Sequence, residues 1–194
     1  LSRESVANGT NLTRCGTDRL SESLGNPVDL FRLSVENRRG GLAAVHLARR
    51  VGAHLFVTAG SPEKRCYLKR LGIPHVMNSR TLEFAETIMT VTQGEGVDVV
   101  LNSLAGDFIE RSLAVTAKGG TFLELGRSGI WTPEKVERSR PDVAYHAIDL
   151  TEDMAQRPES VRPLFDAILE QIAVVSLPTL PCRVFSKDAT GDAF

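Results

Sequence analysis

The chain has 194 residues, about the length of one domain, and 42% of them are hydrophobic, so a buried core is expected and a wholly disordered chain is excluded. Its 23 Lys and Arg residues almost balance its 24 Asp and Glu residues, which argues against a nucleic-acid-binding domain because such domains usually carry a basic excess. No apolar run approaches the roughly 20 residues of a membrane helix, so no membrane partner is expected.

The three cysteines, Cys15, Cys66 and Cys182, are far apart and form no Cys-x-x-Cys pair. This spacing excludes a disulfide scaffold and a structural zinc site built on cysteine pairs, and it fits the reducing cytoplasm. The chain begins at Leu1 with no visible signal peptide and stops at Phe194, inside a segment that is typical of a helix. We therefore expect a piece of a longer polypeptide.

Residues 1–40 are predicted to be an irregular or disordered segment. They are polar, rich in Ser, Arg, Asn and Thr, and without clear periodicity, and residues 28–31 alone have a faint strand pattern. At the other end, residues 175–194 contain two prolines, a short strand pattern at 183–185 and the start of a helix.

Residues 41–174 alternate between helix and strand patterns. The predicted helices are 42–51, 62–71, 81–91, 108–115 and 159–174, and the predicted strands are 54–58, 75–77, 97–101, 121–125 and 143–148. Strands separated by helices favour an α/β fold, a Rossmann-like doubly wound parallel sheet. We expect this sheet to be incomplete, because no clear strand precedes the first helix.

Ligands of such sheets bind beyond the carboxyl ends of the strands. Gly40 and Gly41 stand at the turn into the first helix, where backbone N–H groups and the helix dipole could meet a pyrophosphate, although an ordinary turn is the alternative. Two later strand ends are predicted to face the same crevice unless they are simple turns: Asn102, Ser103 and Leu104 after one strand, and Gly126 with Arg127 after the other.

The end of the second strand favours NADP(H) over NAD(H). An NAD-binding fold keeps an acidic residue for the ribose about 20 residues after the glycine turn, and no acid stands at this strand end. Ser61, Lys64 and Arg65 instead offer a hydroxyl and two cations, which suit a 2′-phosphate. A solvated helix start is the alternative, but basic residues in a first turn oppose the helix dipole unless an anion binds there.

Several segments, taken in order, closely resemble the enoylreductase domain of modular type I polyketide synthases and animal fatty acid synthases, in the medium-chain dehydrogenase/reductase superfamily. They are residues 42–48, 60–65, 78–80, 96–106, 122–127, 130–150, 180–185 and 192–194. The resemblance covers roughly residues 41–194 and the cofactor-binding half only. It implies an NADP(H)-binding Rossmann domain over 41–174, with 175–194 as the start of a return segment to a missing substrate domain, and it adds Arg80 to the cofactor-binding residues.

The reaction that the resemblance implies is the NADPH-dependent reduction of a 2-enoyl thioester on an acyl carrier protein, next to other synthase domains and without zinc. Hydride goes to the β carbon, and the enolate must then be stabilised and protonated. The family's proton-donor candidates, a lysine and an aspartate, fall on Arg127 and Asp149. Because a guanidinium stays protonated, Arg127 is predicted to stabilise the enolate, which leaves protonation to Asp149, a water or a group outside this chain. For Asp149 a helix N-cap is an equal alternative.

The family pattern Gly-Gly-Val-Gly is absent before Leu42, where this chain has Arg38, Arg39, Gly40 and Gly41. We hypothesise that residues 1 to about 40 are translated out of frame, since Arg-Arg-Gly-Gly codons read one base later can give Gly-Gly-Val. A natural, degenerate loop is the alternative, and genuine arginines there should weaken NADPH binding severely, because their side chains block close backbone approach to the pyrophosphate.

Three readings of the function stay open. The first is the cofactor-binding half of such an enoylreductase, with little or no activity by itself because the substrate half is missing. The second is a free-standing oxidoreductase like the quinone reductases. The third is a non-catalytic fragment that binds no cofactor.

Overall fold

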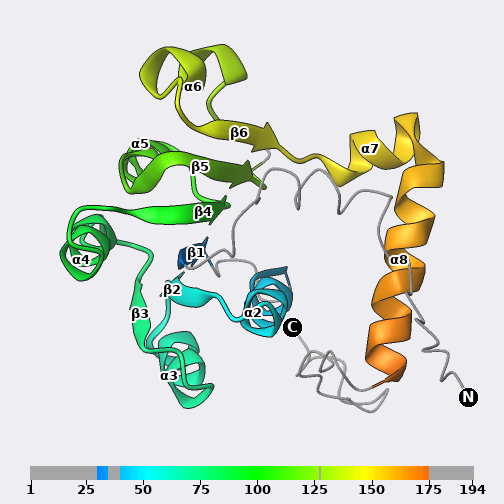
Figure 1. Ribbon diagram of the computed structural model, residues 1–194, viewed down its shortest axis with the longest axis horizontal. Helices are drawn as coiled ribbons and strands as arrows, with labels where there is room; N and C mark the ends of the chain where they lie inside the picture. The colour runs from blue at the N-terminus through cyan, green and yellow to red at the C-terminus, as the bar shows by residue number, and fades with distance from the viewer. Residues whose placement is uncertain (1–29, 35–39, 127, 175–194) are drawn as a thin grey trace, which may run out of the picture.

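The computed structural model describes residues 30–34, 40–126 and 128–174, and these form a sheet with helices on both faces (Figure 1). The six strands lie in the order β3-β2-β1-β4-β5-β6, and every neighbouring pair is parallel. This order and the parallel pairing are those of a doubly wound dinucleotide-binding sheet, so the predicted fold class is confirmed. The strands are β1 Leu30–Ser34, β2 His54–Ala59, β3 His75–Asn78, β4 Val97–Asn102, β5 Thr116–Glu124 and β6 Ala144–Ala147.

The first strand corrects the expectation for residues 1–40. Leu30–Ser34 form β1 at the centre of the sheet, where Leu33 pairs with Val57 of β2 and with Leu101 of β4. The expectation of an irregular segment is therefore wrong over these five residues, and the sheet does not lack its first strand. The expectations for residues 1–29, 35–39 and 175–194 lie outside the described residues.

The helices connect the strands and follow the predicted ones closely, with two additions. They are α2 Gly40–Arg50, α3 Pro62–Arg70, α4 Phe84–Val91, α5 Asp107–Ala114, α6 Pro133–Ser139, α7 Leu150–Gln156 and α8 Pro158–Ala173. The short helix α6 was not expected from the sequence, and α7 was expected only through the alternative role of Asp149 as a helix N-cap. Among the described residues, no helix has the length and apolar character needed to cross a membrane.

Alternating side chains of the strands build a separate apolar cluster on each face of the sheet. Leu55 and Val57 of β2 pack with Val45 of α2 and Leu68 of α3 on one face. On the other face Phe56 of β2 belongs to a cluster with side chains of α4, α5 and α6, among them Phe84, Ile109 and Val136, and with Val100 and Phe122 of the sheet. Because successive strand residues point to opposite faces, β2 contributes to both clusters and is buried on both sides.

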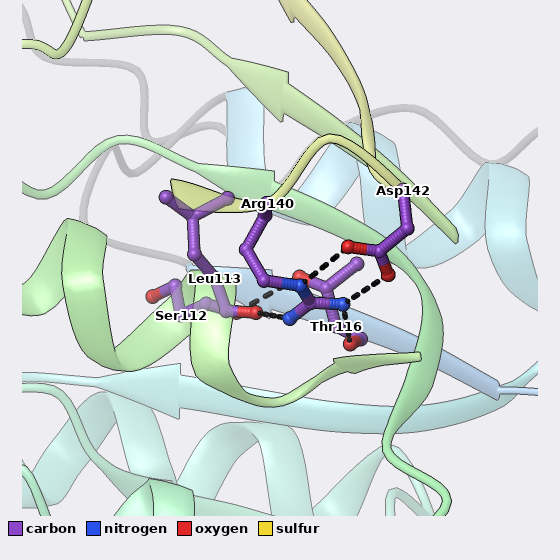
Figure 2. A network of polar contacts seen from close by, with 5 residues as sticks. All are labelled: Ser112, Leu113, Thr116, Arg140 and Asp142. Atoms are coloured by element: carbon purple, nitrogen blue, oxygen red, sulfur yellow. Dashed lines mark hydrogen bonds and ion pairs between the residues drawn. The ribbon is translucent and has the colours of Figure 1, made fainter. Parts of the chain in front are cut away.

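A network of polar contacts holds the amino end of β5, where the strand begins (Figure 2). The guanidinium of Arg140 donates through Nη1 to the carbonyl of Leu113 and through Nη2 to the carbonyl of Thr116 at 2.9 Å. It also forms two bonds with the carboxylate of Asp142, at 2.9 and 2.8 Å. Arg140 therefore ties the connection between α6 and β6 to the turn between α5 and β5.

The last two helices lie beside the sheet rather than on it. In Figure 1 the arrows of β4, β5 and β6 point to the side where α7 and α8 lie. Both helices carry large apolar side chains in exposed positions: Leu150, Met154, Phe165, Ile168 and Leu169. Because α7 follows β6 directly, it flanks the edge of the sheet formed by the carboxyl ends of the strands.

Candidate functional site

The carboxyl ends of the six parallel strands share one edge of the sheet, and the connections to the helices leave from it. At the end of β1 the described chain resumes at Gly40, the first residue of α2, and Gly41 follows in the first turn and is buried. The backbone N–H groups of a helix's first turn have no partner within the helix, which makes this position suited to an anion. Arg38 and Arg39 lie outside the described residues.

The end of β2 holds the residues predicted to bind a 2′-phosphate. Ser61 caps α3, and its Oγ accepts a hydrogen bond from Lys64 N at 3.3 Å. The guanidinium of Arg65 turns back and donates to the carbonyls of Ala59 at 3.0 Å and Gly60 at 2.9 Å. Ser61 and Arg65 therefore shape this turn, which agrees with the alternative of a capped helix start and leaves the 2′-phosphate role a prediction.

Arg80 reaches the same edge from the end of β3. Its backbone N–H donates to Asn78 Oδ1 at 3.1 Å, and Arg65 Nη1 contacts the same oxygen at 3.5 Å. Asn78 thereby joins the turns after β2 and β3, and the side chain of Arg80 is exposed next to them. The structure brings the predicted residues Ser61, Arg65 and Arg80 to one corner of the edge.

The ends of β4 and β5 are joined by a buried carboxylate that sequence reasoning did not single out. Glu124, the last residue of β5, is fully buried, and its Oε2 accepts a hydrogen bond from Asn102 Nδ2 at 2.8 Å. Its Oε1 accepts from Gly126 N at 2.7 Å. Burial raises the pKa of Glu124, and the hydrogen bonds from Asn102 and Gly126 oppose that rise. The available signal was an acid within the apolar run Phe122-Leu123-Glu124-Leu125.

Three buried polar atoms at this edge have no hydrogen-bond partner among the described residues. They are Thr58 Oγ1 near the end of β2, Asn102 Oδ1 at the end of β4 and Ser103 Oγ directly after it. A buried polar group without a partner costs free energy, so most such groups in proteins are paired with protein, water or ligand. The carboxyl edge therefore offers polar groups whose hydrogen-bonding capacity the described chain does not use.

A hollow of about 380 Å³ opens beside the end of β5. Its walls include Gly126 and Ile130 from the turn after β5, Ile148 and Asp149 from the turn after β6, and Arg157. The predicted catalytic residue Asp149 is exposed and caps α7, because its carboxylate accepts from Thr151 N at 2.9 Å and from Glu152 N at 3.3 Å.

The expected N-cap role of Asp149 is therefore confirmed, and its catalytic role stays a prediction. The other predicted catalytic residue, Arg127, lies outside the described residues. It directly follows Gly126, which the structure places on the wall of the hollow next to Asp149. The catalytic role of Arg127 stays a prediction as well.

Tyr145 of β6 lies beside β5 and supports the loop that follows this strand. Its ring stacks on Phe122 with centroids 5.7 Å apart, and its hydroxyl donates to the carbonyl of Trp131 at 2.9 Å. Burial and the nearby charge of Glu124 raise the pKa of Tyr145 to about 12. The phenol is therefore neutral around pH 7 and serves as a hydrogen-bond donor to the loop that carries Trp131.

Metal binding has no support in the donor set of the described residues. No three His, Cys, Asp or Glu side chains in ranges 30–34, 40–126 and 128–174 come together as a metal site would require. Zinc sites in proteins need three or four such ligands, so the side chains of these ranges do not fit a zinc ion.

A comparison with protein families matches residues 41–170 to the family described as zinc-binding dehydrogenase. The chain is also 39% identical, over 156 residues, to a phenolphthiocerol/phthiocerol polyketide synthase of Mycobacterium tuberculosis. That match takes in 79% of this chain and 7% of the synthase, so the chain spans a small part of that relative.

The solved structures that resemble this chain include enoyl reductases and a quinone oxidoreductase. The CurK enoyl reductase shares 45% identity with a TM-score of 0.77, over 87% of this chain and 50% of that one. The nucleotide-binding subdomain of the enoylreductase domain of PpsC from Mycobacterium tuberculosis shares 35% identity with a TM-score of 0.70, over 84% of this chain and 94% of that one. The Escherichia coli quinone oxidoreductase complexed with NADPH has a TM-score of 0.65 at 23% identity, a likeness in fold alone. The chain thus belongs to the zinc-binding dehydrogenase family, and within it to the enoylreductase domains of polyketide synthases, of which it represents the nucleotide-binding half.

Proposed function

We propose that this chain is the NADPH-binding part of an enoylreductase that reduces a 2-enoyl thioester on an acyl carrier protein. The pathway is polyketide (or fatty acid) biosynthesis in the cytoplasm, with neighbouring synthase domains as partners. The observation that carries the proposal is the 35% identity to the nucleotide-binding subdomain of an enoylreductase, across 94% of that subdomain. A free-standing quinone reductase is less well supported, because the likeness to such an enzyme is one of fold alone, at 23% identity.

The residues at the carboxyl edge fit a dinucleotide. The first turn of α2 supplies unpaired backbone N–H groups around Gly40 and Gly41 for a pyrophosphate. The unpartnered atoms Asn102 Oδ1 and Ser103 Oγ offer an acceptor and a hydroxyl to polar groups of the cofactor. Leu104 and Gly126 complete this edge, because Leu104 O accepts from Asn102 Nδ2 at 2.7 Å and Gly126 N donates to Glu124.

The preference for NADPH rests on charge at the end of β2. Its last residues and the following turn, Thr58 to Ser61, contain no carboxylate, and the first acid of α3, Glu63, contacts the Ser61 side chain and lies near the charge of Arg65. Lys64, Arg65 and Arg80 supply positive charge at the same corner. A phosphate dianion there would gain charge-assisted hydrogen bonds that a 2′-hydroxyl lacks.

Bound NADPH would supply the hydride for the β carbon of the enoyl group. The chain's own residues act on the charge that develops at the thioester oxygen. The guanidinium of Arg127 would stabilise the enolate, since it remains protonated at all relevant pH values. Asp149, a water or a group outside this chain would protonate the α carbon. We propose trace or no turnover by the chain alone, because the chain spans half of the CurK enoyl reductase.

Binding of NADPH to the 194-residue chain, followed by nicotinamide fluorescence, tests the cofactor assignment. We expect Lys64→Ala to weaken NADPH binding about tenfold, which corresponds to about 1.4 kcal/mol, and to leave NADH binding unchanged. Lys69→Ala, an exposed lysine in the last turn of α3, is the matched control and should change neither affinity. Equal affinity of the unaltered chain for NADPH and NADH would contradict the 2′-phosphate assignment, and no binding of either would favour a non-catalytic fragment.

A further inference from the structure

Glu124 is the one charged side chain at the carboxyl edge, among the described residues, that is completely buried. It ends β5 and faces two polar groups from different segments: Asn102 Nδ2 from β4 at 2.8 Å and Gly126 N from the following turn at 2.7 Å. Both groups are hydrogen-bond donors, and a carboxylate accepts on both oxygens. The carboxylate therefore matches both neighbours at once.

Glu124 fixes the orientation of the Asn102 amide. The Nδ2 group of Asn102 donates to Glu124 Oε2 and also to the carbonyl of Leu104 at 2.7 Å, so both of its N–H bonds are used by acceptors. A flipped amide would place Oδ1 against two acceptor oxygens, which is unfavourable. Oδ1 is thus held away from Glu124, buried and without a partner among the described residues.

Glu124 also fixes the turn that follows β5. Its Oε1 receives the Gly126 N–H, and a Cβ built on Gly126 would come within 2.8 Å of that oxygen and 2.7 Å of Ile130 Cγ2. The turn therefore packs directly on the carboxylate, and a side chain at this position would have to displace Glu124 or Ile130.

We propose that Glu124 is a positioning residue, which holds the Asn102 carbonyl and the Gly126 turn in the arrangement that receives the cofactor. The inference rests on the proposed NADPH binding at this edge. A glutamine in its place could accept from one neighbour but would turn a donor toward the other. The substitution would therefore weaken cofactor binding through Asn102 and Gly126, although Glu124 itself is buried.

The energetics of Glu124 support a role in function rather than in folding. Burial raises the pKa of this carboxyl, so the fold favours its protonated form more than the unfolded chain does, while the hydrogen bonds from Asn102 and Gly126 favour the carboxylate. Ionisation above the folded pKa therefore reduces the stability of the fold, in the opposite sense to an ordinary ion-paired acid. A residue that costs stability when ionised is more readily explained by the two groups that it orients.

The test compares Glu124→Gln with the unaltered chain in two measurements. The first is NADPH affinity by nicotinamide fluorescence, for which we expect at least a tenfold loss. The second is hydrogen exchange, without nucleotide, of the Gly126 amide and of the Asn102 side-chain amide; the group that the glutamine no longer accepts from should exchange at least tenfold faster. Thr116→Val is the matched control, since it removes a buried hydrogen bond, Thr116 Oγ1 to Ser112 O at 2.9 Å, at the other end of β5. It should lower the melting temperature and leave both measurements at the edge unchanged.

The outcomes separate this inference from the proposed function. NADPH binding by Glu124→Gln that equals that of the unaltered chain, or that falls no further than in Thr116→Val, would overturn the positioning role. If the unaltered chain bound no NADPH while either amide exchanged faster in Glu124→Gln, the contact would stand, but the proposed function and the positioning role would both fall. Weaker binding together with faster exchange, in Glu124→Gln alone, supports both.

Discussion

Replacing Gly96 with alanine is expected to lower the free energy of unfolding by about 3 kcal/mol or more. Gly96 leads into β4 with a φ of +85°, a conformation that residues with a Cβ rarely adopt. A Cβ there would come within 2.6 Å of the backbone oxygen of Val115 and 3.1 Å of Ala117 N. Because both atoms belong to the backbone at the start of β5, neither can move aside without distorting the β4–β5 pairing.

Urea denaturation of the chain measures this effect, and Gly94→Ala is its matched control. Gly94 has a similar φ of +92°, but nothing lies within 4 Å of the position of its Cβ. That substitution should cost about 1 kcal/mol from backbone conformation alone. The difference between the two variants isolates the steric clash, and equal losses would show that no clash exists.

Replacing Arg140 with methionine is expected to cost about 3 kcal/mol of unfolding free energy. The guanidinium holds the carbonyls of Leu113 and Thr116 and the carboxylate of Asp142, as Figure 2 shows. Methionine fills a similar volume but leaves these acceptors without their donor. Arg162→Met is the control, because the pair Arg162–Asp166 is exposed on α8 and should contribute less than about 1 kcal/mol. Urea denaturation of both variants should show the contrast, and a loss no larger than that of Arg162→Met would contradict the structural role of Arg140.

The effect of Arg140→Met should depend on pH in a defined direction. The hydrogen bond and charge of Arg140 lower the pKa of Asp142 from 3.8 to about 2. A carboxyl whose pKa is lower in the folded state contributes stability that is complete above its unfolded value and is lost as the pH falls through its folded value. The stability difference between the unaltered chain and Arg140→Met should therefore be constant near neutral pH and narrow between about pH 4 and pH 2. Urea midpoints measured across this range check it, and a difference that widens on acidification would contradict the ion pair.

Periodicity was enough to predict most of the sheet and its helices, and the misses have local causes. The apolar residues Leu30, Phe31 and Leu33 are interrupted by Arg32 and flanked by polar residues. This is a weak pattern for a central strand, which usually has a continuous apolar run. The short helix α6 was missed, although Thr132 caps it by accepting from Lys135 N, and α7 was not among the predicted helices, although Asp149, which accepts from Thr151 N, was considered as an N-cap. The Thr-Pro pair at the start of α6 and the Asp at the start of α7 are typical of helix starts and would have predicted both helices.

The buried pair at the centre of the site could not be predicted from the sequence. Asn102 and Glu124 are 22 residues apart, and they meet because β4 and β5 pair in a register that sets these two residues opposite each other. That register includes an irregularity between Val97 and Val99, and β5 begins at Thr116, earlier than the predicted start at 121. Register depends on tertiary packing, and periodicity does not specify it.

The hypothesis of an out-of-frame segment stays a prediction for residues 1 to about 40. We expect the nucleotide sequence that encodes residues 1–41 to contain, in another frame, a Gly-Gly-Val-Gly turn preceded by an apolar strand. An open, correct frame as given would instead favour a natural, altered loop. The strand at Leu30–Ser34 shows that this stretch of residues, as given, can take the central place in the sheet.

The position of β1 divides the sheet into two blocks that have no direct backbone pairing with each other. β2 and β3 lie on one side of β1, and β4, β5 and β6 lie on the other. The strand pairs with β2 through five residues and with β4 through three, and Phe56 adds side-chain packing across the boundary. Each block therefore depends on β1 for its backbone connection to the other, so this strand contributes to the cooperativity of the sheet. Loss of β1 would therefore leave the cofactor corner at β2 and β3 joined to the part of the sheet beside the hollow by side-chain packing alone.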